Sequence, residues 1–270
     1  MLGDPLVTSF MTEGLRLEFH TPPRLTFSPL PRALPSFSQL HMIRPFLPDL
    51  LSRGIIREIL SPQPLFFSRV FVVPKKDGPM RLVLDLSVLN KMLIVPTFKM
   101  ETVSRIAPGL IGPLWGCTMD LQDAYFHVPI DWHFHIYLAF IVDGRVYVFQ
   151  YLPFGLSVAP WAFSRVIKPV KAHLHRLAIL VSSYLDDFIF FHRSPDGLRQ
   201  NLSVVMSLFR RLGIKMKPEK SNLHPSQKVN FLGVLFHLDT MCLSLPPEKV
   251  DLIVALCQDM LSRSHLSLRS

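Results

Sequence analysis

Two adjacent aspartates interrupt a long apolar segment of the chain, and this pair limits what the segment can fold into. The apolar runs 179–181 and 188–191 flank Asp186 and Asp187. Strand-forming runs on both sides of a short polar pair predict a β-hairpin with the two carboxylates at its tip. Because neighbouring like charges resist ionisation, such a tip is best stabilised by a cation. Taken alone, a polar turn explains the pair equally well, since Asp is a common turn residue.

A third carboxylate extends this interpretation. Asp120 follows the apolar stretch 114–119 and opens the segment 120–126. Carboxylate oxygens are the ligands that Mg²⁺ and Mn²⁺ prefer. Three carboxylates can hold two ions about 3.5–4 Å apart, the arrangement with which polymerases and many nucleases displace phosphoryl groups in line. The pattern predicts two Mg²⁺ ions, with Mn²⁺ as the alternative, and a fold that pairs Asp120 with the hairpin.

Read in order, six motifs between about Phe67 and Phe236 resemble the reverse transcriptases of retroelements. The motifs are the segments 71–90, 120–126, 152–163, 184–187, 213–220 and 231–233. The residues of several motifs are similar to those of tyrosine-recombinase retrotransposons of the DIRS type, and LTR elements of the Ty3/gypsy kind share most of these residues. The resemblance implies an α+β fold, the right-hand polymerase fold, in which helices back one face of an antiparallel palm sheet and the other face is free for chemistry.

The resemblance also implies a division of the chain. Residues 1–47 carry many prolines and little periodicity, which predicts an extended N-terminal arm. Residues 48–237 correspond to fingers and palm, and 238–270 to the start of a truncated thumb or connection. The fingers would take 48–95 and 128–160, and the palm 96–127 and 161–237. A short thumb predicts poor processivity and leaves no room for an RNase H domain.

Local patterns predict several individual elements. Apolar spacing indicates a helix over about 48–58 that breaks near Gly54, and one over 163–174 that Pro169 should kink. A further helix should begin at Ser194 and end before Gly213. Strands are expected over 69–73 and 80–86, and the period-two spacing of His133 and His135 indicates another strand. The histidines lack zinc-site spacing and are expected to be ordinary surface or core residues.

The resemblance assigns site residues position by position. Catalysis and metal binding fall on Asp120, Asp186 and Asp187, with the backbone carbonyl of Leu121 as a further ligand. The nucleotide-binding positions are Lys75, Lys76, Arg81, Asp123, Ala124, Tyr125, Phe154 and Lys220. The primer grip corresponds to Phe231, Leu232 and Gly233.

Some of these positions have a competing interpretation, and one departs from the family pattern. The segment 75–78 is also a good hairpin tip, and its two lysines are equivalent candidates for gripping a triphosphate. Tyr125 corresponds to a steric gate against the ribose 2′-hydroxyl, or packs in the core. Phe154 stands where retroviral enzymes commonly have a glutamine, so it can pack but cannot hydrogen-bond a nucleotide. Lys217 competes with Lys220 as a general acid, and a solvated basic face accounts equally well for both.

Composition agrees with a nucleic-acid enzyme. The 270 residues are 49% hydrophobic, enough for a sizeable core. Twenty-nine basic and 20 acidic residues give a formal net charge of +9, which favours polyanionic partners, although solubility alone would explain it. Three distant cysteines form neither a zinc motif nor a disulfide framework, as is typical of a reducing compartment. We expect no membrane association and a place in the cytoplasm or nucleus.

Two functional hypotheses follow. The first is an RNA-directed DNA polymerase that extends a primer on an RNA or DNA template with dNTPs. The second is a catalytically inactive, truncated or domesticated polymerase fold that binds nucleic acid or protein. A nuclease is a weaker third hypothesis, because it would leave the fingers-like and primer-grip motifs unexplained.

Overall fold

The chain crosses three times between two structural units. A computed structural model describes residues 3–75 and 78–262. One unit comprises Met1–Lys99 and Asp123–His173, and the other comprises Met100–Gln122 and Leu174–Ser270. The crossings fall after residues 99, 122 and 173, whereas the predicted boundaries between fingers and palm lie after residues 95, 127 and 160.

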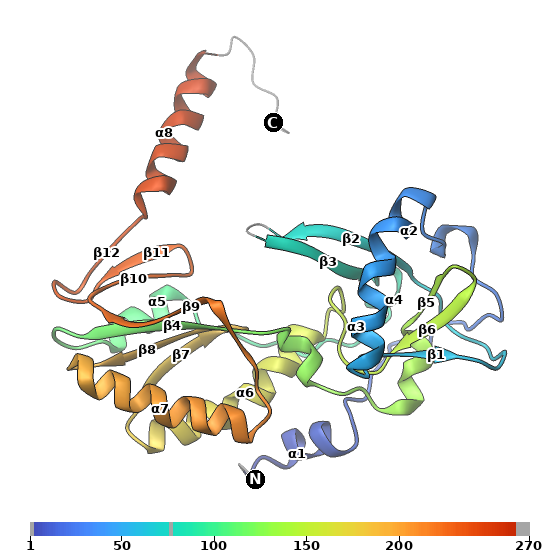
Figure 1. The fold of residues 1–270 in the computed structure, drawn as a ribbon, viewed down its shortest axis with the longest axis horizontal. Helices are drawn as coiled ribbons and strands as arrows, with labels where there is room; N and C mark the ends of the chain where they lie inside the picture. The colour runs from blue at the N-terminus through green and yellow to red at the C-terminus, as the bar shows by residue number, and fades with distance from the viewer. Residues whose placement is uncertain (1–2, 76–77, 263–270) are drawn as a thin grey trace. The chain divides into compact units, whose positions relative to one another are not determined.

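The first unit holds two antiparallel sheets and several short helices (Figure 1). One sheet has the order β1-β6-β5, with β1 at Ile56–Ile59, β6 at Arg145–Phe149 and β5 at Ala139–Val142. The other is the hairpin of β2 (Arg69–Lys75) and β3 (Gly78–Asp85), close to the two expected strands. The helices are α1 (Pro5–Thr12), α2 (Phe37–Ile43), α3 (Leu47–Ser52) and α4 (Ser87–Asn90). The 3-10 turns are η1 (Pro31–Ala33), η2 (Arg44–Phe46), η4 (Ala124–His127) and η5 (Trp132–Tyr137).

The N-terminal segment is packed into this unit, so the expectation of an extended arm is wrong. Phe10, Leu15 and Leu17 are buried. Leu15 forms a β-bridge with Ile130, and its backbone N–H donates to the carbonyl of Pro129 at 2.8 Å. Single apolar side chains anchor an irregular segment here, and such anchors leave no periodic signal in a sequence.

Two other local expectations need correction. The break expected near Gly54 is confirmed, since Gly54 turns the chain at φ +66°, but the helix expected over 48–58 already ends at Ser52 and residues from Ile56 pair with β6. The strand expected around His133 and His135 is the 3-10 turn η5. In that turn Trp132 is exposed and His135 is buried. The two-residue spacing of the histidines therefore belongs to a 3-10 turn and not to the pleat of a strand.

The second unit is built on a four-stranded antiparallel sheet with the order β7-β8-β4-β9. Its strands are β7 (Leu180–Tyr184), β8 (Asp187–His192), β4 (Trp115–Leu121) and β9 (Met216–Ser226). The remaining elements are α5 (Val103–Ile106), η3 (Ala107–Gly109), α7 (Pro195–Arg211), β10 (Lys228–Phe231), β11 (Val234–His237), β12 (Cys242–Ser244) and α8 (Pro247–Ser262).

Helix α7 confirms the expected start and stop signals. The Ser194 hydroxyl accepts from the backbone N–H of Gly197 at 3.2 Å, Pro195 opens the first turn, and Gly213 ends the helix region at φ +71°. The helix covers one face of the sheet (Figure 1), where the rings of Phe188 and Phe209 meet at a centroid distance of 5.6 Å.

The opposite face of the sheet is partly covered, which corrects the expectation that it is free. Side chains alternate between faces along a strand. Ile189 and Phe191 of β8 therefore point away from α7, and they pack with Val229, Phe231 and Phe236 of the β10-β11 hairpin. Asp187 begins β8 at the other end of the strand, where its side chain is partly buried.

Helix α6 (Ala159–Arg176) runs from the first unit into the second as one helix. Pro169 lies inside this helix, and the kink expected there stays a prediction. Helix α8 has no buried side chain among its residues. In the described part of the chain, no helix is both long and apolar enough to cross a membrane.

Candidate active site

The aspartate pair occupies the predicted hairpin. Tyr184 and Asp187 are the last paired residues of β7 and β8, and Leu185 and Asp186 form the turn between them. Leu185 adopts φ +53°, a left-handed conformation that is uncommon outside glycine and that this tight turn requires. The hairpin is tied to the next strand, since the Leu121 N–H donates to the Asp186 carbonyl at 2.9 Å.

Strand pairing brings the third carboxylate to this hairpin. Asp120 lies directly opposite Asp187 in the β4-β8 ladder, and cross-strand partners project on the same face of a sheet. Burial, followed by the nearby charges of Asp186 and Asp120, raises the pKa of Asp187 to about 6. The fold therefore concentrates negative charge that water only partly screens.

A lysine from β9 neutralises part of this charge. The Lys217 ammonium donates to Asp120 Oδ1 at 3.0 Å and to the Leu121 carbonyl at 3.3 Å. The side chains of Lys217 and Asp120 are 15% and 16% exposed, so the ion pair is mostly shielded from water. Both of its acceptors are atoms that the sequence assigned to metal binding.

Ser221 fixes the backbone that presents this lysine, and no sequence motif indicated this role. Its hydroxyl accepts from the Asp120 N–H at 3.1 Å and donates to the Lys217 carbonyl at 2.6 Å. The register of β9 against β4 shifts here, from Asp120 opposite Lys217 to Thr118 opposite Asn222, which is an irregularity of the β-bulge kind. No sequence motif predicted this register shift.

The donor atoms suit a hard divalent cation, but they are not gathered around one point. Asp120, Asp186 and Asp187 supply carboxylate oxygens, and Leu121 supplies a carbonyl that already faces a cation. Among the described residues, no cluster of three or more Asp, Glu, His or Cys side chains has the geometry of a metal site. The ammonium of Lys217 contacts two of these donor atoms, Asp120 Oδ1 and the Leu121 carbonyl oxygen.

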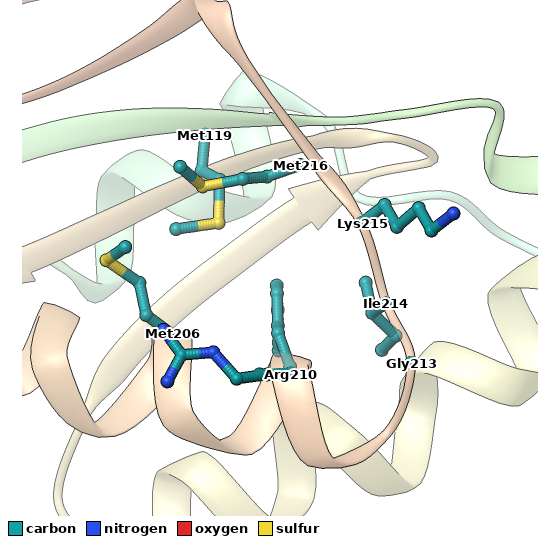
Figure 2. A pocket seen from close by; sticks show the side chains of 8 residues that line it. Met119, Met206, Arg210, Gly213, Ile214, Lys215 and Met216 are labelled. Carbon is teal, nitrogen blue, oxygen red and sulfur yellow. The ribbon is translucent and has the colours of Figure 1, made fainter.

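A cavity lies on the other side of the same sheet. It has a volume of about 340 Å³ and is lined by Met119, Met206, Phe209, Arg210, Gly213, Ile214, Lys215 and Met216. Figure 2 shows that the side chains of Met119, Met206 and Met216 approach one another from β4, α7 and β9. Two of these residues are next to Asp120 and Lys217 in sequence, so the strands that carry the ion pair are backed by flexible thioethers instead of branched side chains.

The predicted nucleotide-binding residues after Asp120 belong to the first unit. Asp123 has φ +48° and accepts from Arg53 at 2.9 Å, and Arg53 also binds Asp49 of α3 at 3.0 Å. Ala124 is buried. Tyr125 is half-buried. The partnership of Arg53 with Asp123 joins distant parts of the sequence, and nothing in either segment indicated it.

Arg81 and Phe154 form one group in the first unit. The Arg81 guanidinium lies over the Phe154 ring, 4.2 Å from the ring centroid, in cation–π geometry. The Arg81 Nε atom is buried without a hydrogen-bond partner. Phe154 also packs against Tyr125, with ring centroids 5.3 Å apart. The Lys75 side chain and the whole of Lys76 lie outside the described residues.

The remaining predicted positions are in the second unit. Phe231 is buried in the core, and Leu232 and Gly233 form the turn between β10 and β11 at φ +52° and +71°. The Lys249 ammonium of α8 donates to the Gly233 carbonyl at 2.9 Å. Lys220 is exposed on β9, so the structure brings Lys217 to the carboxylates and leaves Lys220 at the surface.

A family model described as "Reverse transcriptase (RNA-dependent DNA polymerase)" matches residues 73–236, which include every predicted catalytic position. The chain belongs to the reverse transcriptase family. This confirms the motif-based resemblance over more than half of the chain.

Named relatives of this reverse transcriptase chain are transposon polyproteins. It is 29% identical over 208 residues to the retrovirus-related Pol polyprotein from transposon opus of Drosophila melanogaster, a match that covers 75% of the chain. It is 28% identical over 211 residues to that from transposon gypsy of the same species, covering 76% of the chain. The chain spans about a fifth of the length of these curated relatives, 20% in both cases.

Solved structures confirm the α+β polymerase fold. A foamy viral protease-reverse transcriptase in complex with dsDNA aligns with a TM-score of 0.70 at 24% identity, covering 90% of this chain and 50% of that one. The same type of viral enzyme with an RNA/DNA hybrid aligns with a TM-score of 0.68 at 24% identity, covering 88% and 32%.

Proposed function

We propose that this chain is the catalytic part of a retrotransposon RNA-directed DNA polymerase, which adds dNTPs to a primer 3′-OH on an RNA or DNA template. The observation that carries the proposal is the register of β4 against β8, which sets Asp120 opposite Asp187 beside the Asp186 turn. Family membership over 73–236 supports it. The double-stranded DNA and RNA/DNA hybrid bound by the foamy viral enzymes support a template–primer as the partner.

Metal ions have a defined place in this proposal. Asp120, Asp186, Asp187 and the Leu121 carbonyl would hold two divalent ions, Mg²⁺ or Mn²⁺. When bound, the ions lower the pKa of the primer hydroxyl and neutralise the triphosphate. The residues of the chain supply position and charge, because phosphoryl transfer of this kind needs no covalent protein nucleophile.

Residues of the first unit would select and hold the nucleotide. We assign Tyr125 to exclusion of the ribose 2′-hydroxyl, supported by two phenylalanine rings that pack against it. We assign Arg81 to the triphosphate, supported by its stacking on Phe154, which fixes the guanidinium while leaving Nε without a partner. The turn Leu232-Gly233 is assigned to the primer terminus.

The retroelement subclass is also proposed. The DIRS type is favoured by the segments 98–100, 123–130 and 152–156. The similarity to transposon gypsy agrees with this, because both groups share most of the motif residues. The test is the genomic DNA on both sides of the segment that encodes this chain. A tyrosine recombinase encoded beside it supports the DIRS type, whereas an integrase overturns it.

Primer extension tests the enzymatic proposal. The purified chain is given a primed RNA template, Mg²⁺ and dNTPs, beside an Asp186→Asn variant. Asp239→Asn is the matched control, since Asp239 is exposed in the same unit and its contact to the Thr240 N–H survives the change. We expect templated product from the wild type and the control, and none from Asp186→Asn. A folded wild type that binds primer–template without extending it would instead indicate a non-catalytic polymerase fold.

A further inference from the structure

Lys217 is a cation built into the carboxylate site of this chain. Its Nζ atom contacts Asp120 Oδ1 at 3.0 Å and the Leu121 carbonyl at 3.3 Å. A carboxylate oxygen and a carbonyl oxygen of successive residues form a chelating pair suited to a hard cation. An ammonium group fits the same pair as a donor, so lysine and metal ion compete for the same oxygens.

The backbone around Lys217 favours this arrangement before any ion arrives. Ser221 bonds to both the Asp120 N–H and the Lys217 carbonyl, which ties the irregular part of β9 to β4. The lysine side chain is largely buried beside its partner. A buried carboxylate without a counter-charge is costly, and Asp187 next to Asp120 adds to that cost.

We propose that Lys217 is a positioning residue that holds the carboxylate site together in the metal-free protein and is displaced from Asp120 and Leu121 when a divalent ion binds. This deepens the proposed function, on which it rests for the identity of the metal ligands. Displacement costs part of the free energy of ion binding, so the lysine lowers the affinity of the site for metal. The Lys217 charge also allows the hairpin to fold without metal. Because it lowers the affinity, the fraction of sites that hold an ion depends on the ion concentration over a higher range.

Direct measurement of Mn²⁺ binding without nucleic acid tests the proposal. Free Mn²⁺ is followed by its EPR signal in titrations of the wild type and of Lys217→Met, which keeps the length of the side chain and removes its charge. Lys228→Met is the matched control, because Lys228 is exposed on β10 in the same unit. Asp120→Asn in the wild-type background identifies the site, since it should remove the tightest Mn²⁺ ion.

The expected result is a tighter site in Lys217→Met. We expect its tightest dissociation constant to fall about tenfold, and that of Lys228→Met to stay at the wild-type value, because competition by one mostly shielded charge is removed. The metal-free Lys217→Met protein should melt at a lower temperature than wild type, and Mn²⁺ should raise its melting temperature by more. Affinity that is unchanged or weaker in Lys217→Met overturns the proposal, as does a wild type with no Mn²⁺ site that depends on Asp120.

A second measurement needs no variant, in case Lys217→Met does not fold. Amine labelling of the wild type, located by mass spectrometry, reports the accessibility of Lys217. We expect Mn²⁺ to increase labelling of Lys217 and to leave Lys228 unchanged, and protection of Lys217 by Mn²⁺ would overturn the proposal. None of these measurements uses DNA synthesis. Failure of the polymerase assignment would therefore appear in primer extension while the ion exchange persisted.

Discussion

Tyr125 shows how one side chain is set by its neighbours. Its ring packs on Phe154 at 5.3 Å and on Phe163 at 6.2 Å between centroids, the latter edge-to-face. Offset and edge-to-face aromatic pairs are favourable and limit ring motion. Core packing and a steric gate were alternatives from the sequence, and the half-buried position of the ring is compatible with both roles at once.

The gate assignment predicts a change in sugar selectivity. Tyr125→Val removes the ring, so we expect ribonucleotide incorporation to rise at least about tenfold relative to dNTP incorporation, which corresponds to about 1.4 kcal/mol of lost discrimination. Single-nucleotide extension with matched rNTP and dNTP measures the ratio. Tyr125→Phe keeps the ring and is the control. Equal selectivity in Val and Phe variants would remove Tyr125 from this role.

The cysteines are predicted to differ sharply in reactivity. Burial raises the pKa of Cys117 on β4 to about 12, while Cys242 and Cys257 are exposed. Because the thiolate is the reactive form, iodoacetamide at about pH 8 should modify Cys242 and Cys257 in the native protein and Cys117 only after unfolding. Peptide mass spectrometry follows each site. Rapid native labelling of Cys117 would contradict the packing of β4 against α7.

At the scale of elements, hydrogen bonds from Asn90 join the segment 71–90 to the loop at 155–157 in the first unit. Asn90 at the end of α4 donates to the Gly155 carbonyl at 2.8 Å and accepts from the Ser157 N–H at 2.9 Å. Gly155 has φ +102°, and a Cβ atom there would lie 2.5 Å from the Leu84 carbonyl oxygen of β3. The loop that carries Phe154 is thus pressed against β3, where Arg81 originates.

Substituting this glycine separates strain from overlap. Gly155→Ala combines an unfavourable φ with a backbone clash, so we expect it to lower the free energy of unfolding by about 3 kcal/mol or more. Gly144→Ala is the matched control, because Gly144 has φ +75° with open space around its Cβ position, and it should cost only about 1–2 kcal/mol. Urea unfolding measures both. Equal losses would show that the overlap with Leu84 relaxes freely.

At the scale of the whole molecule, the predicted site residues divide between the two units. Arg81, Tyr125 and Phe154 belong to one unit, and Asp120 and Lys217 to the other. The chain passes between them directly after β4, so the segment 120–126 contributes to both. A motif that looks continuous in sequence therefore serves two structural units.

The net charge of +9 predicts salt-sensitive binding of nucleic acid. Each phosphate contact releases condensed counterions, so the logarithm of the association constant should fall linearly with the logarithm of salt concentration, with a slope of about −0.7 to −0.9 per contact. Fluorescence anisotropy with a labelled RNA/DNA hybrid between about 50 and 200 mM salt gives the slope. Binding that is independent of salt would show that the basic residues do not contact the phosphates.

The sequence by itself determined the elements whose signals are local. Alternation around Asp186 and Asp187 predicted the hairpin, and Ser194 with Pro195 and Gly213 predicted α7, because capping and pleating depend on residues close in the chain. The type and order of the motifs also predicted the family, which the match over residues 73–236 confirms, and the roles of the three carboxylates within it stay a prediction.

Only the tertiary structure decided the features that depend on register and on distant partners. A register shift in the pairing of β9 with β4 places Lys217, and not Lys220, opposite Asp120. The Ser221 hydroxyl stabilises this register by donating to the Lys217 carbonyl. Arg53 reaches Asp123, and isolated apolar residues near the N-terminus pack into the first unit. Irregular pairing and single long-range contacts have no periodicity, so a linear pattern contains no record of them.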